Sequence, residues 1–208
     1  MPAYFSVDFQ YKKDDIRNLS EIYNALLDCG LKFKSGYYNS ENDTWDDIIA
    51  WNQSKFDEDF ELGDAEHYSH DYKQMLFDFH DFSEVRFFIL NVRGEDVISF
   101  FLIIPEADLL QDTKLYDIIS KKDKMKLIEQ LAIDIWSHGN VCCIQTGWEG
   151  SECSTSMKEI IEGREPLIEP FAIVPRSLYR EKWGCVKRDI EGNGAYIHNK
   201  EHWCYLQD

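Results

Sequence analysis

Two apolar segments of the chain, residues 85–92 and 97–104, are separated by only four residues, Arg93, Gly94, Glu95 and Asp96. Both segments are rich in the β-branched and aromatic residues that favour strands, and a short glycine-containing connection between two such runs is typical of a β-hairpin. The apolarity of both runs is nearly continuous, as in strands that are covered on both faces. The sequence therefore predicts a central hairpin in a sheet with helices lying on it.

Further strands are indicated by alternation and by short apolar runs. In residues 4–11, apolar residues at positions 5, 7 and 9 alternate with polar residues at 6, 8 and 10, and a period of two predicts a half-buried strand. The other segments that we expect to be strands are residues 31–38, 77–79, 141–146, 171–174, 185–190 and 195–205.

Helices are predicted where apolar residues recur every three or four positions behind a capping residue. The clearest segments are residues 16–29 and 121–138, each followed by a glycine that ends the helix. The residues expected to cap helices are Asp14 or Asp15, Asp43, Ser120 and, in a capping box with Glu159, Ser156.

These elements together define the expected fold class. We expect an α+β fold with one mixed, largely antiparallel sheet and helices packed on it. The 208 residues contain no Pro/Ser/Gly-rich linker, so residues 1–208 are predicted to form a single α+β domain.

Residues 39–84, here called the acidic segment, carry fourteen acidic residues against two lysines, Lys55 and Lys73, and account for most of the formal net charge of −17. Aromatic residues such as Trp45 and Trp51 are interspersed among the acids. Disordered acidic tails are poor in aromatic residues, because such chains cannot bury enough surface to offset their ordering entropy. We therefore expect the acidic segment to be folded and to display negative charge beside large rings.

A surface of this kind suits a basic protein partner, because complementary charge speeds association and buried rings act as anchors. The residues predicted to bind such a partner are Asp43, Trp45, Asp46, Asp47, Trp51, Phe56, Asp57, Asp59, Phe60, Glu61, Asp64 and Tyr68. The alternative is that the rings all point into the core and that the acids serve only solubility.

The same charge excludes other partners. It repels nucleic-acid phosphates and anionic membrane surfaces, so we expect no direct nucleic-acid binding and no membrane binding. The N-terminal residues lack the basic and long apolar regions of a signal peptide, and the longest apolar run, residues 98–105, is too short to cross a bilayer. We therefore expect a cytoplasmic protein with reduced thiols.

Two groups of side chains have the types that zinc prefers. They are His67, His70 and His80, and His198, His202 and Cys204 with Cys185 on the facing strand. Residues 198 and 202 of one extended strand are ~13 Å apart, whereas zinc ligands lie within about 2 Å of one ion. We therefore expect no bound metal and no cofactor.

Cys142 and Cys143 are the candidate nucleophiles, and His138 is the histidine nearest to them in sequence. Neither cysteine is expected at a helix start or beside a cluster of cations, the settings that lower the pKa of a thiol. The sequence also lacks a nucleophile elbow, a phosphate-binding loop and a dinucleotide-binding motif. We predict structural cysteines and no catalytic residue.

These features favour an inhibitory binding protein over an enzyme. An acidic domain that masks the basic active cleft of a partner, such as a toxin nuclease, blocks the substrate phosphates, as bacterial immunity proteins do. The alternatives are a small metal- or cysteine-dependent enzyme that uses His67, His70, His80 or Cys142, and a non-catalytic scaffold or adaptor subunit. Metal content tests the enzyme, and the salt dependence of a partner complex separates the inhibitor from the scaffold.

Overall fold

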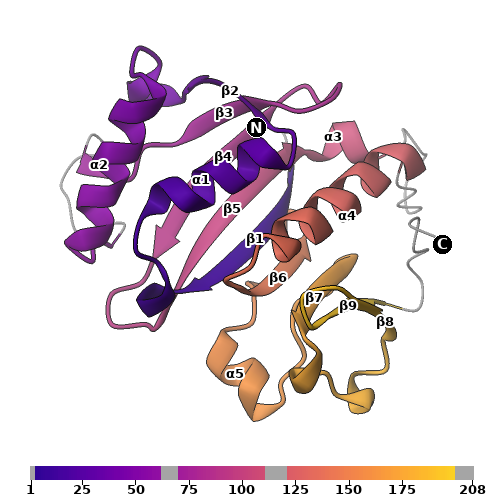
Figure 1. Ribbon diagram of the computed structural model, residues 1–208. Helices are drawn as coiled ribbons and strands as arrows, with labels where there is room; N and C mark the ends of the chain where they lie inside the picture. The colour runs from indigo at the N-terminus through magenta and orange to yellow at the C-terminus, as the bar shows by residue number, and fades with distance from the viewer. Residues whose placement is uncertain (1–2, 62–69, 111–120, 200–208) are drawn as a thin grey trace.

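The computed structural model describes residues 3–61, 70–110 and 121–199. Within these ranges nine strands form one sheet in the order β2-β3-β4-β5-β1-β6-β7-β9-β8, and all neighbouring strands are antiparallel (Figure 1). The α+β class with one largely antiparallel sheet is confirmed. The strands are β1 (Tyr4–Lys12), β2 (Lys32–Gly36), β3 (Met75–Asp78), β4 (Val85–Asn91), β5 (Val97–Pro105), β6 (Val141–Gly147), β7 (Phe171–Pro175), β8 (Val186–Ile190) and β9 (Gly194–His198).

The predicted hairpin is formed by β4 and β5, and its second strand pairs with β1 in the middle of the sheet. The helices are α1 (Leu19–Asp28), α2 (Trp45–Asp57), α3 (Glu106–Leu109), α4 (Lys122–Ser137) and α5 (Met157–Glu162).

The helix caps correct part of the sequence prediction. The side chain of Asn18, rather than Asp14 or Asp15, accepts a hydrogen bond at the start of α1. Thr44 caps α2 in a reciprocal capping box with Asp47, so the prediction of Asp43 as the cap is wrong by one residue. The capping box that starts α5 is confirmed. Ser120 lies outside the described residues.

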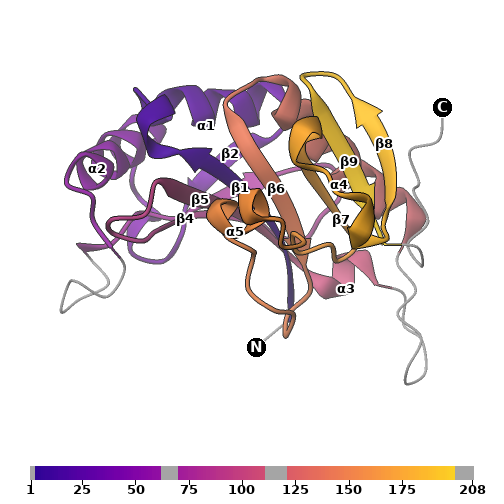
Figure 2. The same cartoon turned by 90° about the horizontal axis from the view of Figure 1, so that it is seen from below.

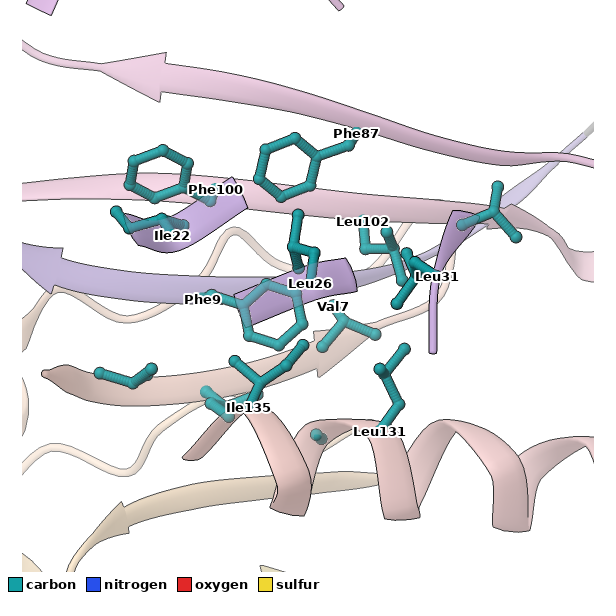
Figure 3. Close-up of a cluster of buried hydrophobic side chains, with 14 of the residues drawn as sticks. Val7, Phe9, Ile22, Leu26, Leu31, Phe87, Phe100, Leu102, Leu131 and Ile135 are labelled. Carbon is teal, nitrogen blue, oxygen red and sulfur yellow. The ribbon is translucent and has the colours of Figure 1, made fainter. Parts of the chain in front are cut away.

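One face of the sheet carries the main core. Ile22 and Leu26 of α1 lie beside Phe87 and Phe100 of the hairpin and Phe9 of β1, and residues of α4 lie on the other side of Phe9 (Figure 3). Each of these five side chains is at most 7% exposed. Burial of this apolar face of β1, β4 and β5 by α1 and α4 is the main source of the free energy of folding.

The opposite face of the sheet is covered at one end and open at the other. Met157 and Ile160 of α5 and Trp183 pack on Ala172 of β7 and Ile197 of β9. Figure 2 shows that α5 lies away from α1, which covers the first face.

The β4–β5 hairpin has no such cover. Phe88 and Phe101 are only partly buried, and Leu90 and Val92 are 36% and 45% exposed. The prediction that both faces of the hairpin are covered is therefore wrong, because residues of the second face point into an open concavity rather than against a helix.

Phe87 provides a test of this two-faced hairpin. Phe87 is 1% exposed and stacks on Phe100, so Phe87→Ala should lower the free energy of unfolding by ~3–5 kcal/mol. The neighbouring Phe88 stacks on Phe101 across the open face, so Phe88→Ala should cost only ~1–2 kcal/mol. Chemical denaturation measures both, and equal costs would contradict the assignment of the faces.

Candidate functional site

Helix α2 and its C-cap present four of the seven exposed acidic residues in the described part of the acidic segment. Asp46 and Asp47 in its first turn, and Asp57 and Glu58 at its end, are all exposed, while the exposed residues between them are small. Asp46 and Asp47 also stabilise the positive N-terminus of the helix. The outward face of α2 is therefore an acidic stripe without bulky side chains.

The two lysines of the acidic segment are directed inward. Lys55 Nζ lies 3.2 Å from Glu58 Oε2 and 5.2 Å from the centre of the Trp51 ring, and its side chain is 13% exposed. Lys73 Nζ lies 2.7 Å from Asp43 Oδ2 and 4.8 Å from the centre of the same ring. Because both lysines are paired within the fold, the exposed charges of α2 are all negative.

Asp59 and Glu61 have structural partners near the hairpin turn. Asp59 Oδ1 accepts hydrogen bonds from Asn91 Nδ2 at 2.9 Å and from Lys13 Nζ at 2.7 Å, and these bonds lower the pKa of Asp59 to about 2. A Glu61 carboxylate oxygen accepts a hydrogen bond from the Arg93 backbone N–H at 3.2 Å. These two carboxylates stabilise the fold, as do those of Asp47 in the capping box and of Glu58 beside Lys55. Asp46 and Asp57 are the exposed acids of α2 that form no ion pair among the described residues.

The predicted ring anchors contribute mainly to packing. Phe60 is 9% exposed, Trp45 lies edge-on against two core phenylalanines, and Phe56 packs against the same core. These rings hold α2 on the sheet, so the charges and rings of the acidic segment do not form one mixed surface. Asp64 and Tyr68 lie outside the described residues.

A recess of about 450 Å³ adjoins α2 and is lined in part by Asp43, Trp51 and Asp71. Trp51 donates its indole N–H to the backbone oxygen of Asp71 at 2.8 Å. Tyr38, which also lines the recess, is 63% exposed and has a φ of 58°. Large residues rarely adopt this left-handed conformation, which costs on the order of 1–3 kcal/mol. An exposed ring in a strained turn beside Asp71 and the Asp43–Lys73 ion pair is a candidate anchor for a partner.

Tyr38 was not among the predicted site residues, because residues 31–38 were predicted to be one strand, whereas β2 ends at Gly36. A Cβ at Gly36 would lie 2.0 Å from the Ser40 backbone oxygen, so the chain makes a close turn that only glycine allows. This glycine is the local signal that directs Tyr38 away from the sheet.

A larger concavity of about 1000 Å³, here called the sheet groove, lies on the open face of the sheet. Its floor is formed by Asp8 and Gln10 of β1 and by the β5 residues opposite them in register, Phe101 and Ser99. These positions share a face because alternate residues of a strand point to the same side. The sequence predicted this polar face of β1, but in the structure Asp8 and Gln10 are 1% and 4% exposed.

The loop between β6 and α5 forms one wall of the sheet groove. The Gln145 side chain holds this loop by accepting a hydrogen bond from the Thr155 N–H at 3.0 Å and by donating one to the Thr155 oxygen at 2.8 Å. Trp148 and Ile161 add apolar surface to the groove. The charged residues that line it are Asp8, Lys12, Asp14, Glu95, Asp96, Glu152, Lys158 and Glu162.

The Asp8 carboxylate is the most perturbed acid of the sheet groove. Burial raises the pKa of Asp8 to about 6, against the opposing effect of hydrogen bonding from Ser154, Gln10 and Ser99. Its Oδ2 accepts a hydrogen bond from Gln10 Nε2 at 3.0 Å, but no donor among the described residues is in hydrogen-bonding geometry with Oδ1. A perturbed, incompletely paired carboxylate in a concavity of this size marks a candidate binding site.

Among the described residues, the geometry gives no support to the metal and cysteine alternatives. In residues 3–61, 70–110 and 121–199, no group of three His, Cys, Asp or Glu side chains is arranged to hold a metal ion. His67, His202 and Cys204 lie outside these ranges. Burial raises the pKa of Cys142 to about 12 and that of Cys143 well above its usual value, which disfavours the nucleophilic thiolate.

Comparisons with known proteins do not assign the site. No protein-family model, no curated protein and no solved structure matches the chain. In the part of the chain that the structure describes, no helix has both the length and the apolarity to cross a membrane. Any function must therefore be inferred from the acidic stripe, the recess and the sheet groove themselves.

Asp8 generates a prediction about pH. Because its folded-state pKa is raised from 3.8 to about 6, the folded protein binds more protons than the unfolded chain in this window, and wild-type stability falls as the pH rises through it. Asp8→Asn removes this loss. The free energy of unfolding of the variant, relative to wild type, should rise by on the order of 3 kcal/mol between about pH 4 and about pH 7. Denaturation experiments at several pH values measure this difference, and a difference between variant and wild type that does not change with pH would contradict the raised pKa.

Proposed function

We propose that the protein is an acidic inhibitory binding protein, similar in role to an immunity protein, that masks the basic active cleft of a partner such as a toxin nuclease. The observation that carries this proposal is the sorting of charge in the acidic segment. Lys55 and Lys73 are both paired within the fold. Asp46 and Asp57 on α2 are exposed and form no ion pair among the described residues, and Glu58, the partner of Lys55, is also exposed. A cleft that neutralises phosphates is complementary to such a stripe.

The rigidity of α2 supports the same proposal. A capping box fixes its first turn, and Trp45, Ile48 and Phe56 pack its inner face on the core. A preorganised surface loses little conformational entropy on binding, so more of its interaction energy appears as affinity. The packed rings thus contribute by holding the carboxylates in place.

The recess beside α2 supplies the anchor that a charged stripe lacks. Tyr38 offers a large amphipathic ring at the surface, and Asp71 and the Asp43–Lys73 ion pair line the recess next to it. Tyrosines beside desolvated charges are frequent hot spots in protein interfaces. We propose that the stripe steers a basic partner and that Tyr38 slows its dissociation.

Charge reversal on α2 tests the steering. Asp57→Lys with Glu58→Lys places positive charge at the C-terminus of α2, where the helix dipole favours it, so the variant should remain folded. With a partner isolated by affinity capture, surface plasmon resonance should show association slowed about tenfold or more and a weaker dependence on salt.

A matched control is Glu162→Lys with Glu165→Lys, which changes the net charge equally near the end of α5, away from α2 (Figure 1). Charges more than ~8 Å from the contact are screened at physiological salt, so this control should bind like wild type. Equal association rates for wild type and the folded α2 variant would refute the proposal.

Tyr38 provides an independent prediction. Tyr38→Gly removes the ring and relieves the left-handed strain, so the free energy of unfolding should be unchanged or higher by about 1 kcal/mol. Dissociation of the partner should nevertheless be about tenfold faster. Tyr38→Phe, which keeps the ring, should retain most of the affinity. A Tyr38→Gly variant with wild-type dissociation would exclude Tyr38 as an anchor.

A further inference from the structure

The sheet groove lies on the face of the sheet that the α1 and α2 core leaves open, so the inhibitor proposal does not use it. Three of the five exposed large hydrophobic residues in the described part of the chain line it: Leu90, Val92 and Ile161, at 36%, 45% and 54% exposure. Apolar surface concentrated in one concavity marks a binding site more often than scattered exposed residues do.

The floor of the sheet groove adds a specific polar requirement. Asp8 Oδ1 and Gln10 Oε1 are buried acceptors, and no donor among the described residues is in hydrogen-bonding geometry with either, although the Ser99 and Ser154 hydroxyls lie near enough to Asp8 to lower its pKa. The orientation of the Gln10 amide is fixed, because its nitrogen lies 3.0 Å from Asp8 Oδ2 and 3.4 Å from the Thr155 backbone oxygen. Two acceptors are thus left for a group that brings several N–H donors.

The charged residues around the sheet groove are mostly acidic, like Asp8 on its floor. Carboxylates outnumber lysines among the groove residues, with Glu95, Asp96 and Glu162 against Lys12 and Lys158. A negative concavity with low-dielectric walls concentrates small cations. A buried carboxylate next to apolar walls therefore favours a cationic head on an apolar body over a neutral or an anionic ligand.

We propose that the sheet groove binds a small primary amine with an aromatic or aliphatic body. The ammonium group donates hydrogen bonds to Asp8 Oδ1 and Gln10 Oε1, and the body lies against Phe101, Trp148 and Ile161. The volume of about 1000 Å³ is at the upper end of the range for small-molecule sites. No covalent step is involved, and the site is independent of the acidic stripe.

The test uses the full chain and three probes, 2-phenylethylamine, tryptamine and hexylamine, each titrated to millimolar concentration with ¹H–¹⁵N correlation spectra as readout. At least one amine should shift the amide signals of β1, β5 and the loop before α5. The neutral analogue 2-phenylethanol, matched in size to the first probe, should bind at least about tenfold more weakly. Failure of all three amines to bind would overturn the proposal, as would equal binding of alcohol and amine.

Two variants locate the binding. Asp8→Asn keeps the size of the side chain but removes its charge, so affinity for the amine should fall at least about tenfold. Ile161→Ala truncates an exposed wall residue and should weaken binding of all the probes that bind. The charge-reversal variant at Asp57 and Glu58 should bind the amines like wild type, which separates this site from the acidic stripe. Unchanged affinity in the folded Asp8→Asn variant would show surface adsorption and overturn the proposal.

Discussion

The pairing of β1 in the middle of the sheet is the constraint on which the remaining structure depends. β1 pairs along its whole length with β5 and over most of its length with β6. A shift of β1 by one residue, which would exchange its two faces, would therefore break two ladders of hydrogen bonds. Because successive side chains alternate, Phe5, Val7 and Phe9 point to α1 and α4, and Asp8 and Gln10 must point to the opposite side. One strand thus determines both the main core and the floor of the sheet groove.

The two faces of the sheet consequently carry different surfaces. On the first face, α2 packs by its rings and displays carboxylates outward; on the second, the hairpin and the α5 segment enclose an apolar concavity with a buried acid. The carboxylates that contribute to the formal net charge of −17 therefore lie in two different physical settings. Exposed carboxylates on α2 act at long range and are screened by salt, whereas Asp8 acts at contact distance in a medium of low dielectric constant.

Much of the fold follows from local patterns in the sequence. The hairpin, the alternation in β1 and the Ser156–Glu159 capping box were predictable, because each depends on residues close in sequence. Asp43 and Thr44 are both good capping residues, and only the reciprocal contact of Thr44 with Asp47 distinguishes them. By contrast, the partners of Asp59 are 46 and 32 residues away in sequence. The periodicity of apolar residues in the sequence gives no information about such long-range contacts.

The candidate sites were less predictable for the same reason. Composition indicated the acidic segment but not which of its acids were already paired, since that depends on tertiary contacts. The polar face of β1 indicated a solvated surface, because alternation alone does not reveal that the loop before α5 folds over it. Leu90 and Phe101 suggested a covered strand, yet their exposure on the second face creates the apolar walls of the groove.

Buried polar groups in this protein fall into two kinds. Asn52 accepts a hydrogen bond from the Lys73 N–H at 2.7 Å and donates to Tyr23 Oη at 2.7 Å and to the Lys73 oxygen at 2.9 Å. Gln145 is similarly paired at both ends of its amide. The hydrogen bonds of these side chains offset the free-energy cost of burying them, and the same bonds hold a helix or a loop in place.

Asp8 and Gln10 are of the other kind. They share one hydrogen bond and the Ser99 and Ser154 hydroxyls lie near Asp8, but one acceptor of each has no donor in hydrogen-bonding geometry among the described residues. An unpaired buried acceptor costs stability, so packing alone does not explain a carboxylate at this central position. A ligand that donates hydrogen bonds to both oxygens removes that cost. Its affinity is higher because folding has already desolvated these oxygens, so binding does not have to desolvate them.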